Sequence, residues 1–254
     1  MIPKVIHYFW FGNKSIPAED LKNIDTWKKY CPDCELRLWN EHNYEIPDIP
    51  YVREAYESKN WAHLSDYARL DVVYKFGGVY FDTDVELLRA IDELFELDAF
   101  MGFEDGYHVN TGQGFGAKQG SEAIKVMLDG YKNKHFCTGP NTYDMTPCPI
   151  INTEALINAG LIPDNSRQMV LDMEIFPNDY FCPKDMETDK INITNNTYGI
   201  HHFHASWYTP KMKRQQKRCK KIRAVFGIRL GNLIINGIVT AGSIRNVVRK
   251  WLKL

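Results

Sequence analysis

Apolar positions in the first 39 residues alternate between short continuous runs and one longer periodic stretch. Residues 5–11 are a short apolar and aromatic run with the β-branched Val5 and Ile6, and Gly12-Asn13 stops it, while residues 35–39 are a second short segment with Leu36, Leu38 and Trp39. Runs of this kind predict buried strands. Between them, residues 17–30 carry apolar positions at helical spacing. This alternation predicts βα units packed around a parallel sheet.

The most strongly periodic segment covers residues 60–76 and predicts a helix that Gly77 and Gly78 end. One apolar stripe runs along it at a period near 3.6 and comprises Trp61, Leu64, Ala68, Val72 and Phe76. Asp66 and Arg69 are three residues apart on another face, so both side chains can point at one ligand. Residues 79–85 then predict a strand, on which alternation places Tyr80, Asp82 and Asp84 on one side.

The middle of the chain has a less regular pattern. Residues 102–116 are rich in glycine and polar side chains, residues 121–131 predict a helix, and residues 139–149, with three prolines, predict a loop. The polar residues of the glycine-rich segment that could face a ligand are Glu104, Asp105, Asn110 and Gln113.

Composition indicates an ordinary globular protein with an unusual distribution of charge. The 254 residues are 44% hydrophobic and 25% charged, which suits one large domain or one domain with an appendage. The net charge of −1 hides a division of the chain. Residues 211–254 contain 13 Lys or Arg and no Asp or Glu, which leaves 18 basic and 32 acidic residues in residues 1–210. The chain is an acidic body with a basic tail.

The tail combines a polybasic run with an amphipathic helix. Residues 211–223 hold eight Lys or Arg. Farther along, apolar residues recur at helical spacing beside basic ones, at Ile244, Val247, Val248, Trp251 and Leu252. This combination is typical of segments that bind an anionic membrane surface. The alternatives are a helix that packs on the body and a nucleic-acid arm, although no aromatic-studded RNA-binding motif accompanies the charge.

The cysteines and the apolar runs bear on the compartment. Six cysteines form no paired framework, and only Cys31-Pro32-Asp33-Cys34 has the spacing of metal or redox pairs. We expect free thiols in a reducing compartment. The chain opens without a signal-peptide pattern, and no apolar run approaches the roughly 20 residues that span a bilayer. The expected location is therefore cytoplasmic, peripheral on the inner face of the membrane.

The segment Asp82-Thr83-Asp84 carries the strongest chemical signal. Ligands of open α/β sheets bind outside the carboxyl ends of the strands, where these carboxylates are expected. Two hard oxygen ligands there suit Mg²⁺ or Mn²⁺, which would bridge to a diphosphate. Asp-x-Asp alone is also common in solvated turns, so its neighbours decide the interpretation.

Three separated segments together resemble one enzyme family. They are residues 65–84, with Ser-Asp-Tyr-Ala-Arg-Leu and Phe-Gly-Gly-Val-Tyr-Phe-Asp-Thr-Asp, residues 2–12, and residues 200–207, with His-His-Phe-His-Ala-Ser-Trp. This pattern resembles the DXD-containing glycosyltransferases of family 32, which include yeast-type initiating mannosyltransferases, bacterial capsule and O-antigen enzymes and clostridial glucosylating toxins. The resemblance covers residues 2–207, with the middle third poorly matched. It implies the GT-A fold, a Rossmann-like, mostly parallel sheet flanked by helices, in a catalytic domain of residues 1–210 followed by the helical basic tail of residues 211–254.

The resemblance also implies roles for individual residues. Trp10 would stack on the donor base, and Ser206 and Trp207 would close over the diphosphate, although Ala205 replaces a frequent glycine. Asp84 would bind the metal directly, and Asp82 would contact the ribose and the metal. Donor and catalytic roles fall to Ser65, Asp66, Arg69, Tyr80 and Asp82. His202 is the expected third metal ligand, with His201 and His204 as competitors; core packing or surface ion pairing is the alternative for each of these residues.

The implied reaction is a metal-dependent transfer with retention of anomeric configuration. A hexose or N-acetylhexosamine would pass from a nucleotide-sugar, which we expect to be a UDP-sugar although guanine would also stack on Trp10, to a lipid-linked glycan acceptor in bacterial surface polysaccharide synthesis. A double displacement would instead need a carboxylate such as Glu104 or Asp105, while Asn110 and Gln113 would bind sugar hydroxyls or serve only the loop. The alternatives are a toxin-like transferase that modifies a protein and a non-catalytic nucleotide-sugar-binding scaffold.

Overall fold

The computed structural model describes residues 1–204 and 210–251. The chain divides into two compact units. The first comprises residues 1–184 and 192–204, and the second comprises residues 185–191 together with the C-terminal segment. The described part of that segment is helix α6 (Pro210–Trp251). The predicted catalytic domain, residues 1–210, therefore contains the whole of the first unit.

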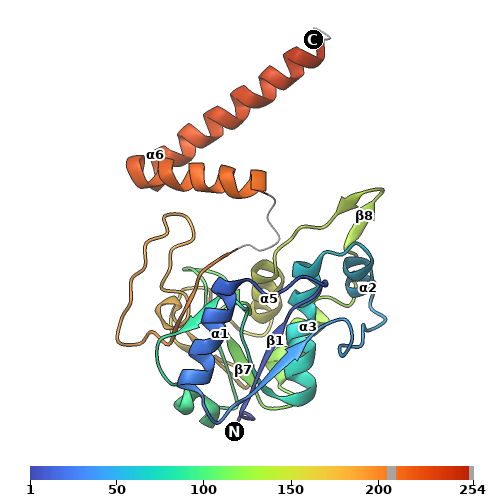
Figure 1. The fold of residues 1–254 in the computed structure, drawn as a ribbon, viewed down its shortest axis with the longest axis vertical. Coiled ribbons are helices and arrows are strands. Elements are labelled where there is room, and N and C mark those ends of the chain that lie inside the picture. The colour runs from blue at the N-terminus through green and yellow to red at the C-terminus, as the bar shows by residue number, and fades with distance from the viewer. Residues whose placement is uncertain (205–209, 252–254) are drawn as a thin grey trace. The chain divides into compact units, whose positions relative to one another are not determined.

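A mixed eight-stranded sheet forms the centre of the first unit (Figure 1). The strand order is β10-β11-β5-β7-β3-β1-β2, with β6 paired to β5. Strand β1 is parallel to β2 and β3, and β5 is parallel to β11, whereas the other pairs are antiparallel. The strands are β1 (Val5–Phe9), β2 (Glu35–Trp39), β3 (Gly78–Tyr80), β5 (Ala99–Phe103), β6 (Val109–Asn110), β7 (Phe115–Ala117), β10 (Gln168–Val170) and β11 (Met173–Phe176).

Helices and two small sheets complete the unit. The α-helices are α1 (Ala18–Tyr30), α2 (Pro50–Glu57), α3 (Trp61–Phe76), α4 (Glu122–Asp129) and α5 (Cys148–Ile157), and the 3-10 helices are η1 (Asp92–Glu96) and η2 (Asn178–Tyr180). The small antiparallel sheets pair β4 (Val85–Leu87) with β12 (Gly199–His201) and β8 (Cys137–Gly139) with β9 (Thr142–Tyr143).

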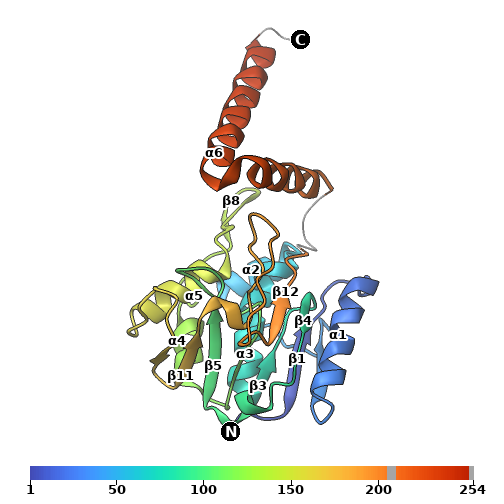
Figure 2. The same cartoon turned by 90° about the vertical axis from the view of Figure 1, so that its left-hand side faces the viewer.

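The central sheet separates two hydrophobic cores, because side chains alternate across a strand. Ile6 of β1 belongs to the core that contains Trp27 of α1, whereas Phe9 belongs to the core that contains Leu64 of α3. Ile124 of α4 belongs to the same core as Leu64, and Figure 2 shows β11, β5, β3 and β1 beside one another in the sheet between the two cores. Strand β5 is buried along its whole length, as expected of a strand covered on both faces. The α/β architecture predicted from the GT-A resemblance is confirmed, and the antiparallel pairs make the sheet mixed.

Helix α3 has the predicted bounds but a different environment. The Asn60 side chain accepts a hydrogen bond from the backbone N–H of His63 at 3.4 Å, and Gly77, at φ 66°, ends the helix. The predicted one-sided apolar stripe is wrong, because α3 is buried on nearly every side, Asp66 and Arg69 included, while Phe76 is 48% exposed. Contacts with β1, α2 and α4 surround this helix and explain the difference.

The single strand predicted over residues 79–85 is also wrong. Strand β3 ends at Tyr80, and β4 begins at Val85 in a different sheet. The backbone N–H of Val85 donates to the Asp82 carbonyl at 3.0 Å, which closes a turn over the polar segment. Aspartate and threonine favour turns because their side chains compete for backbone hydrogen bonds. The two aspartates of the DXD segment therefore lie in a turn between strands.

The loop predicted for residues 139–149 contains regular structure at both ends. Strands β8 and β9 form a short hairpin, and α5 begins at Cys148 directly after Pro147. Pro149 fits the first turn of α5, where no intrahelical partner is needed for its missing N–H. The helices predicted over residues 17–30 and 121–131 are confirmed as α1 and α4.

Helix α6 dominates the second unit and is interrupted at Gly227, whose φ of 74° and ψ of 165° are not helical. Arg223 Nε donates to Asn232 Oδ1 at 2.8 Å across this interruption. Lys220 Nζ pairs with Asp189 Oδ1 at 2.7 Å, so the acidic turn of residues 185–191 contacts the basic helix. Within the described residues, no helix has the length and apolar content required to cross a membrane.

Candidate active site around the Asp82–Asp84 turn

The Asp82–Asp84 turn lies at the carboxyl end of a central strand. Strand β3 lies between β1 and β7, and the backbone N–H of Asp82 continues the sheet by donating to the Gly112 carbonyl at 3.1 Å. Because β1 and β3 are parallel, Trp10, directly after β1, belongs to the same edge. This is the edge at which open α/β sheets bind ligands.

Asp82 is held by a buried cation and a phenol. The Tyr80 hydroxyl donates to Asp82 Oδ1 at 2.6 Å, and Arg69 Nη2 lies 3.2 Å from the same oxygen. The Arg69 guanidinium also lies over the Tyr80 ring, 5.1 Å from its centroid. Burial raises the pKa of Asp82, an effect that Arg69 opposes.

Arg69 is fixed by the helix that carries it. Its Nε donates to the Ser65 carbonyl at 3.1 Å, and its Nη2 lies 3.1 Å from both Ser65 Oγ and Asp66 Oδ1. The Arg69 side chain is 5% exposed. Four of the predicted donor-site residues, Ser65, Asp66, Arg69 and Tyr80, are therefore brought against Asp82. One planar cation between carboxylates is an arrangement that can also bind a phosphate oxygen.

The Asp84 carboxylate contacts strand β12 and the residues that directly follow it. Its Oδ1 lies 3.2 Å from His201 Nε2, and its Oδ2 accepts the backbone N–H of His204 at 2.8 Å. Burial alone would raise the pKa of Asp84, but His201 and the His204 N–H more than offset this effect and hold the pKa below its ordinary range. Asp84 is therefore poised as a carboxylate.

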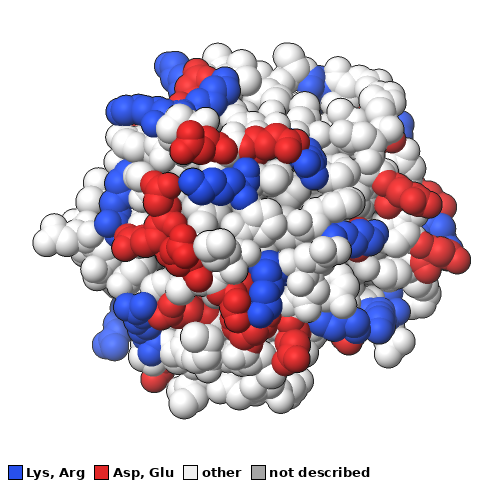
Figure 3. All heavy atoms as spheres, turned by 90° about the horizontal axis from the view of Figure 1, so that it is seen from below, with Lys and Arg blue, Asp and Glu red and all other residues white. Residues whose placement is uncertain are grey.

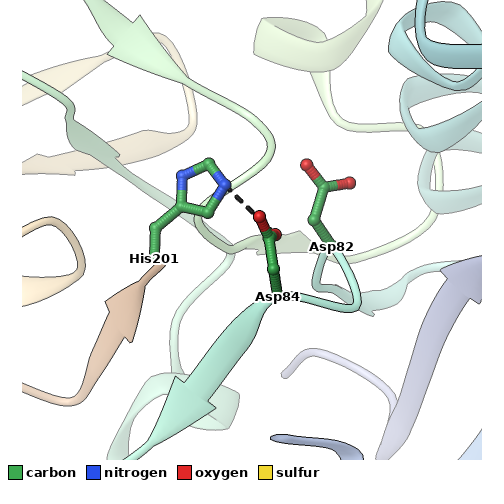
Figure 4. Close-up of side chains that lie close together, drawn as sticks. All are labelled: Asp82, Asp84 and His201. Carbon is green, nitrogen blue, oxygen red and sulfur yellow. Dashed lines mark ion pairs between the residues drawn. The ribbon is translucent and has the colours of Figure 1, made fainter. Parts of the chain in front are cut away.

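Asp82, Asp84 and His201 form the candidate metal centre (Figure 4). One potential ligand atom from each residue lies within 4.8 Å of the other two. Figure 4 shows the two aspartates on the turn and His201 on β12, which runs antiparallel to β4. Two carboxylate oxygens and one imidazole nitrogen form a donor set that fits Mn²⁺ and, less well, Mg²⁺.

Two further observations support the fit of these residues to a cation. The Nδ1 of His201 is buried and has no hydrogen-bond partner among the described residues, so this ring is not fully committed to the protein. Beside the turn, Gly112 leaves open the space next to the Asp82 carboxylate, because a Cβ at this position would collide with Oδ2.

The histidine that lies with the two aspartates is His201, one of the two competitors, and not His202, the expected third ligand. His202 Nε2 pairs with Glu86 Oε2 at 2.8 Å instead. Consecutive residues at a strand end point to opposite sides, and β12 directs His201 toward the aspartates. His204, the other competitor, pairs through Nδ1 with Asp20 Oδ1 at 2.8 Å.

The four polar residues of the glycine-rich segment separate into two pairs. Asn110 Nδ2 donates to Glu104 Oε2 at 3.2 Å, and the charge of Glu104 interacts with that of His201, so this pair adjoins the metal centre. Asp105 accepts backbone N–H groups of its own loop, and Gln113 is fully buried and donates to the Phe103 carbonyl at 2.9 Å. Asp105 and Gln113 are therefore engaged in structural contacts.

The remaining donor-site candidates are Trp10, Ser206 and Trp207. Trp10 is partly exposed, belongs to neither core, and donates from Nε1 to the Lys14 carbonyl at 2.6 Å. Its stacking role stays a prediction. Ser206 and Trp207 lie outside the described residues.

Two further residues beside Asp82 and Arg69, Cys148 and Gly112, could not be recognised from the sequence pattern. Cys148 Sγ lies 3.9 Å from Arg69 Nη1 and 3.7 Å from Thr111 Oγ1, fully inside the donor region. It follows a proline-rich segment that carried no signal of a site. Gly112 was one of several glycines, and only the position of Asp82 distinguishes it.

Comparisons with known proteins match the segment of the chain that carries most of these residues. The model of the glycosyltransferase sugar-binding region containing the DXD motif matches residues 17–101. Inositol phosphoceramide mannosyltransferase 3 of Schizosaccharomyces pombe is 31% identical over 104 residues, which cover 39% of this chain and 29% of that protein. An alpha-1,4-N-acetylglucosaminyltransferase of Homo sapiens is 50% identical over 36 residues, or 14% of this chain and 11% of that protein. These matches span less than a third of either relative.

Among solved structures, the PaToxG glycosyltransferase superposes with a TM-score of 0.49 at 19% identity and covers 62% of this chain and 68% of that chain. A glycosyltransferase involved in glycosylation of the major capsid of PBCV-1 gives a TM-score of 0.42 at 10% identity and covers 84% of this chain and 99% of that one. The matched residues 17–101 contain Asp66, Arg69, Asp82 and Asp84. The resemblance seen in the sequence is confirmed over residues 17–101, which match the glycosyltransferase sugar-binding region containing the DXD motif.

Proposed function

We propose that this protein is a metal-dependent retaining glycosyltransferase. It transfers a hexose or an N-acetylhexosamine from a nucleotide-sugar to a glycan acceptor. The observation that carries the proposal is the meeting of Asp82, Asp84 and His201 beside the buried Arg69. Three potential cation ligands next to a fixed guanidinium are what a leaving nucleoside diphosphate requires.

Acidic and basic residues of the site have different proposed roles. Asp82, Asp84 and His201 hold the cation, which when bound neutralises charge on the leaving diphosphate. Arg69, immobilised by Ser65 and Asp66, presents a second positive group without reorganisation. Trp10 lies at the same sheet edge and supplies an aromatic surface on which the donor base can stack. We favour uracil as this base, and therefore a UDP-sugar as the donor.

The route of retention follows from the carboxylates that the site offers. In the favoured scheme the acceptor hydroxyl attacks from the face that the diphosphate leaves, and the leaving phosphate takes the proton. No enzyme nucleophile is then required. Glu104 is the carboxylate placed for a double displacement, but it is engaged by Asn110 and its pKa is raised by burial. A carboxylate oxygen that already accepts a hydrogen bond is a weaker nucleophile, which favours the first scheme.

We further propose that the acceptor is lipid-linked and that the tail holds the enzyme at an anionic membrane surface, as suits capsule or O-antigen synthesis on the inner face of a bacterial membrane. On the face of the protein shown in Figure 3, acidic and basic side chains are interspersed. The run of residues 211–223, with eight basic and no acidic residues, has one sign of charge. Exposed apolar side chains follow it on α6 at Val225, Phe226, Ile228, Leu230 and Leu233. The name of the fission-yeast relative also includes a lipid acceptor, inositol phosphoceramide.

A thermal-shift panel tests the proposed donor. UDP- and GDP-sugars are each added with Mn²⁺ and with EDTA, because a ligand that binds only the folded state raises the unfolding temperature. We expect UDP-sugars to raise it in Mn²⁺ and to lose most of that effect in EDTA. Equal shifts of the unfolding temperature in Mn²⁺ and in EDTA would refute a donor that binds through the metal. A shift with GDP-sugars alone would show that the donor nucleotide is GDP and not UDP.

A further inference from the structure

One face of helix α1 forms hydrogen bonds with the Asp82–Asp84 turn and with Val85, which follows it. Its polar contacts come from positions spaced as i, i+3 and i+7, which share a helix face. Thr83 Oγ1 donates to Asp20 Oδ2 at 3.0 Å, and Asn23 Nδ2 donates to the Thr83 carbonyl at 3.1 Å. Trp27 Nε1 donates to the Val85 carbonyl at 2.8 Å. The middle residue of the DXD segment is therefore fixed at both its side chain and its backbone.

Asp20 also reaches the second segment of the metal centre. Its other oxygen, Oδ1, lies 2.8 Å from His204 Nδ1. The backbone N–H of His204 in turn donates to Asp84 Oδ2 at 2.8 Å. One carboxylate thus joins the turn that carries the aspartates to the segment that follows His201.

The position of Asp20 differs from that of a ligand. It is not among the three residues whose ligand atoms converge, and its side chain is only 3% exposed. Both of its oxygens are occupied by groups of the protein. A carboxylate suits this place because it accepts hydrogen bonds at two oxygens, whereas an asparagine amide accepts at one.

We propose that Asp20 is a positioning residue of the metal centre. By holding Thr83 on one oxygen and His204 on the other, it fixes Asp84 and His201 at the separation at which both can bind one divalent cation. This inference rests on the proposed metal-dependent function. Groups that orient metal ligands without touching the metal typically change affinity by about 10- to 100-fold when they are removed.

The test is a calorimetric titration of Mn²⁺ into the full-length protein with UDP and, in a parallel series, GDP. Wild type is compared with Asp20→Ala, Asp20→Asn and Thr83→Val. Asp25→Ala is the matched control, since Asp25 lies on the same helix but is 68% exposed. We expect Asp20→Ala to weaken Mn²⁺ binding about 10-fold or more, Asp20→Asn and Thr83→Val to weaken it less, and Asp25→Ala to change it under twofold.

Thermal unfolding of each variant separates positioning from bulk stability. A merely structural role would lower the unfolding temperature and leave the Mn²⁺ affinity of the folded protein unchanged, and that result overturns the inference. If Asp20→Ala does not fold, unchanged affinity in both Asp20→Asn and Thr83→Val overturns it equally. Absence of Mn²⁺-dependent binding of either nucleotide to wild type would instead overturn the proposed function, and this inference with it.

Discussion

Arg69, whose side chain is 5% exposed, forms an ion pair with the partly buried Asp82, with 3.2 Å between Nη2 and Oδ1, and this pair joins helix α3 to the Asp82–Asp84 turn. The same guanidinium nitrogen lies 3.1 Å from Asp66 Oδ1, so one cation balances two carboxylates. Tyr80 completes the enclosure by donating to Asp82. We therefore expect the Arg69 guanidinium to stabilise the fold as well as to bind the donor.

Replacing Arg69 should therefore cost stability in addition to activity. Arg69→Ala leaves the buried Asp66 and the partly exposed Asp82 without their cation. Breaking a fully buried pair typically costs about 3 to 5 kcal/mol, and the exposure of Asp82 places the expected loss at the lower end of this range. Urea unfolding measures the loss. Arg53→Ala is the control, because Arg53 pairs with Asp48 at the surface and 49% of its side chain is exposed. Equal, small losses in both variants would contradict the central place of Arg69.

Gly112 should tolerate no side chain. A Cβ there would collide with Asp82 Oδ2 and lie 3.1 Å from Arg69 Nη1. Gly112→Ala should displace the Asp82 carboxylate and weaken Mn²⁺-dependent nucleotide binding about 10-fold or more, with a stability loss of about 1 to 3 kcal/mol. Gly106→Ala, in the same segment but with no atom within 4 Å of the added Cβ, should bind as wild type does. Indistinguishable affinities for the two variants would show that the space beside Asp82 is not needed.

The buried His7, which belongs to none of the ligand sets proposed above, should control the pH dependence of stability. His7 accepts a hydrogen bond from Trp39 Nε1 at Nδ1 and lies 2.8 Å from the Gly77 carbonyl through Nε2. Burial lowers its pKa from 6.5 to about 4. Between these values the unfolded chain binds a proton that the folded chain does not, so stability falls as the pH is lowered through this window. The loss reaches about 3 kcal/mol near pH 4.

The pH effect is isolated by comparing variants. In His7→Gln the difference in unfolding free energy between pH 7 and pH 4 should shrink by about that amount, because glutamine does not titrate. His42→Gln, at an exposed histidine, should leave the wild-type profile unchanged. Urea unfolding at several pH values gives both results, and parallel profiles for wild type and His7→Gln would rule out His7 as the source.

The tail should bind membranes through its charge. Reversal of four exposed basic residues of α6 to glutamate, at Arg214, Lys217, Arg218 and Lys221, should reduce flotation with anionic liposomes. Each charge near the surface contributes about 1 kcal/mol, so affinity should fall more than about 100-fold. The control reverses four exposed lysines of the body, at Lys22, Lys29, Lys59 and Lys132. The proposed membrane role of the tail would be refuted if the two quadruple variants floated equally. It would also be refuted if full-length protein and a chain ending at residue 210 floated equally.

Periodicity and turn chemistry predicted the first half of the fold well, since α1, α3, β1 and β2 are specified by local patterns. The apolar stripe on α3 was misleading because burial on all sides depends on α2 and α4, which local periodicity does not reveal. The break between Tyr80 and Val85 depends on the hydrogen bond of Asp82 to Gly112, a contact distant in sequence.

The candidate site shows the same limit. Ser65, Asp66, Arg69 and Tyr80 were predicted because they lie within one continuous motif. The choice of His201 over His202 depends on how β12 pairs with β4, so the motif His-His-Phe-His could not decide it. Asp20, Gly112 and Cys148 reach the site only through tertiary packing, and no local pattern marks them.

Asp82, Asp84 and His201 are proposed to hold a divalent cation without which the enzyme cannot use its donor. The decisive measurement is the turnover of a UDP-sugar panel, followed as release of UDP, for wild type and Asp84→Ala in Mn²⁺ and in EDTA. We expect turnover by wild type in Mn²⁺ only and none by Asp84→Ala, whose circular dichroism should match that of wild type. Wild-type turnover that persists undiminished in EDTA, or that survives in Asp84→Ala, would contradict it.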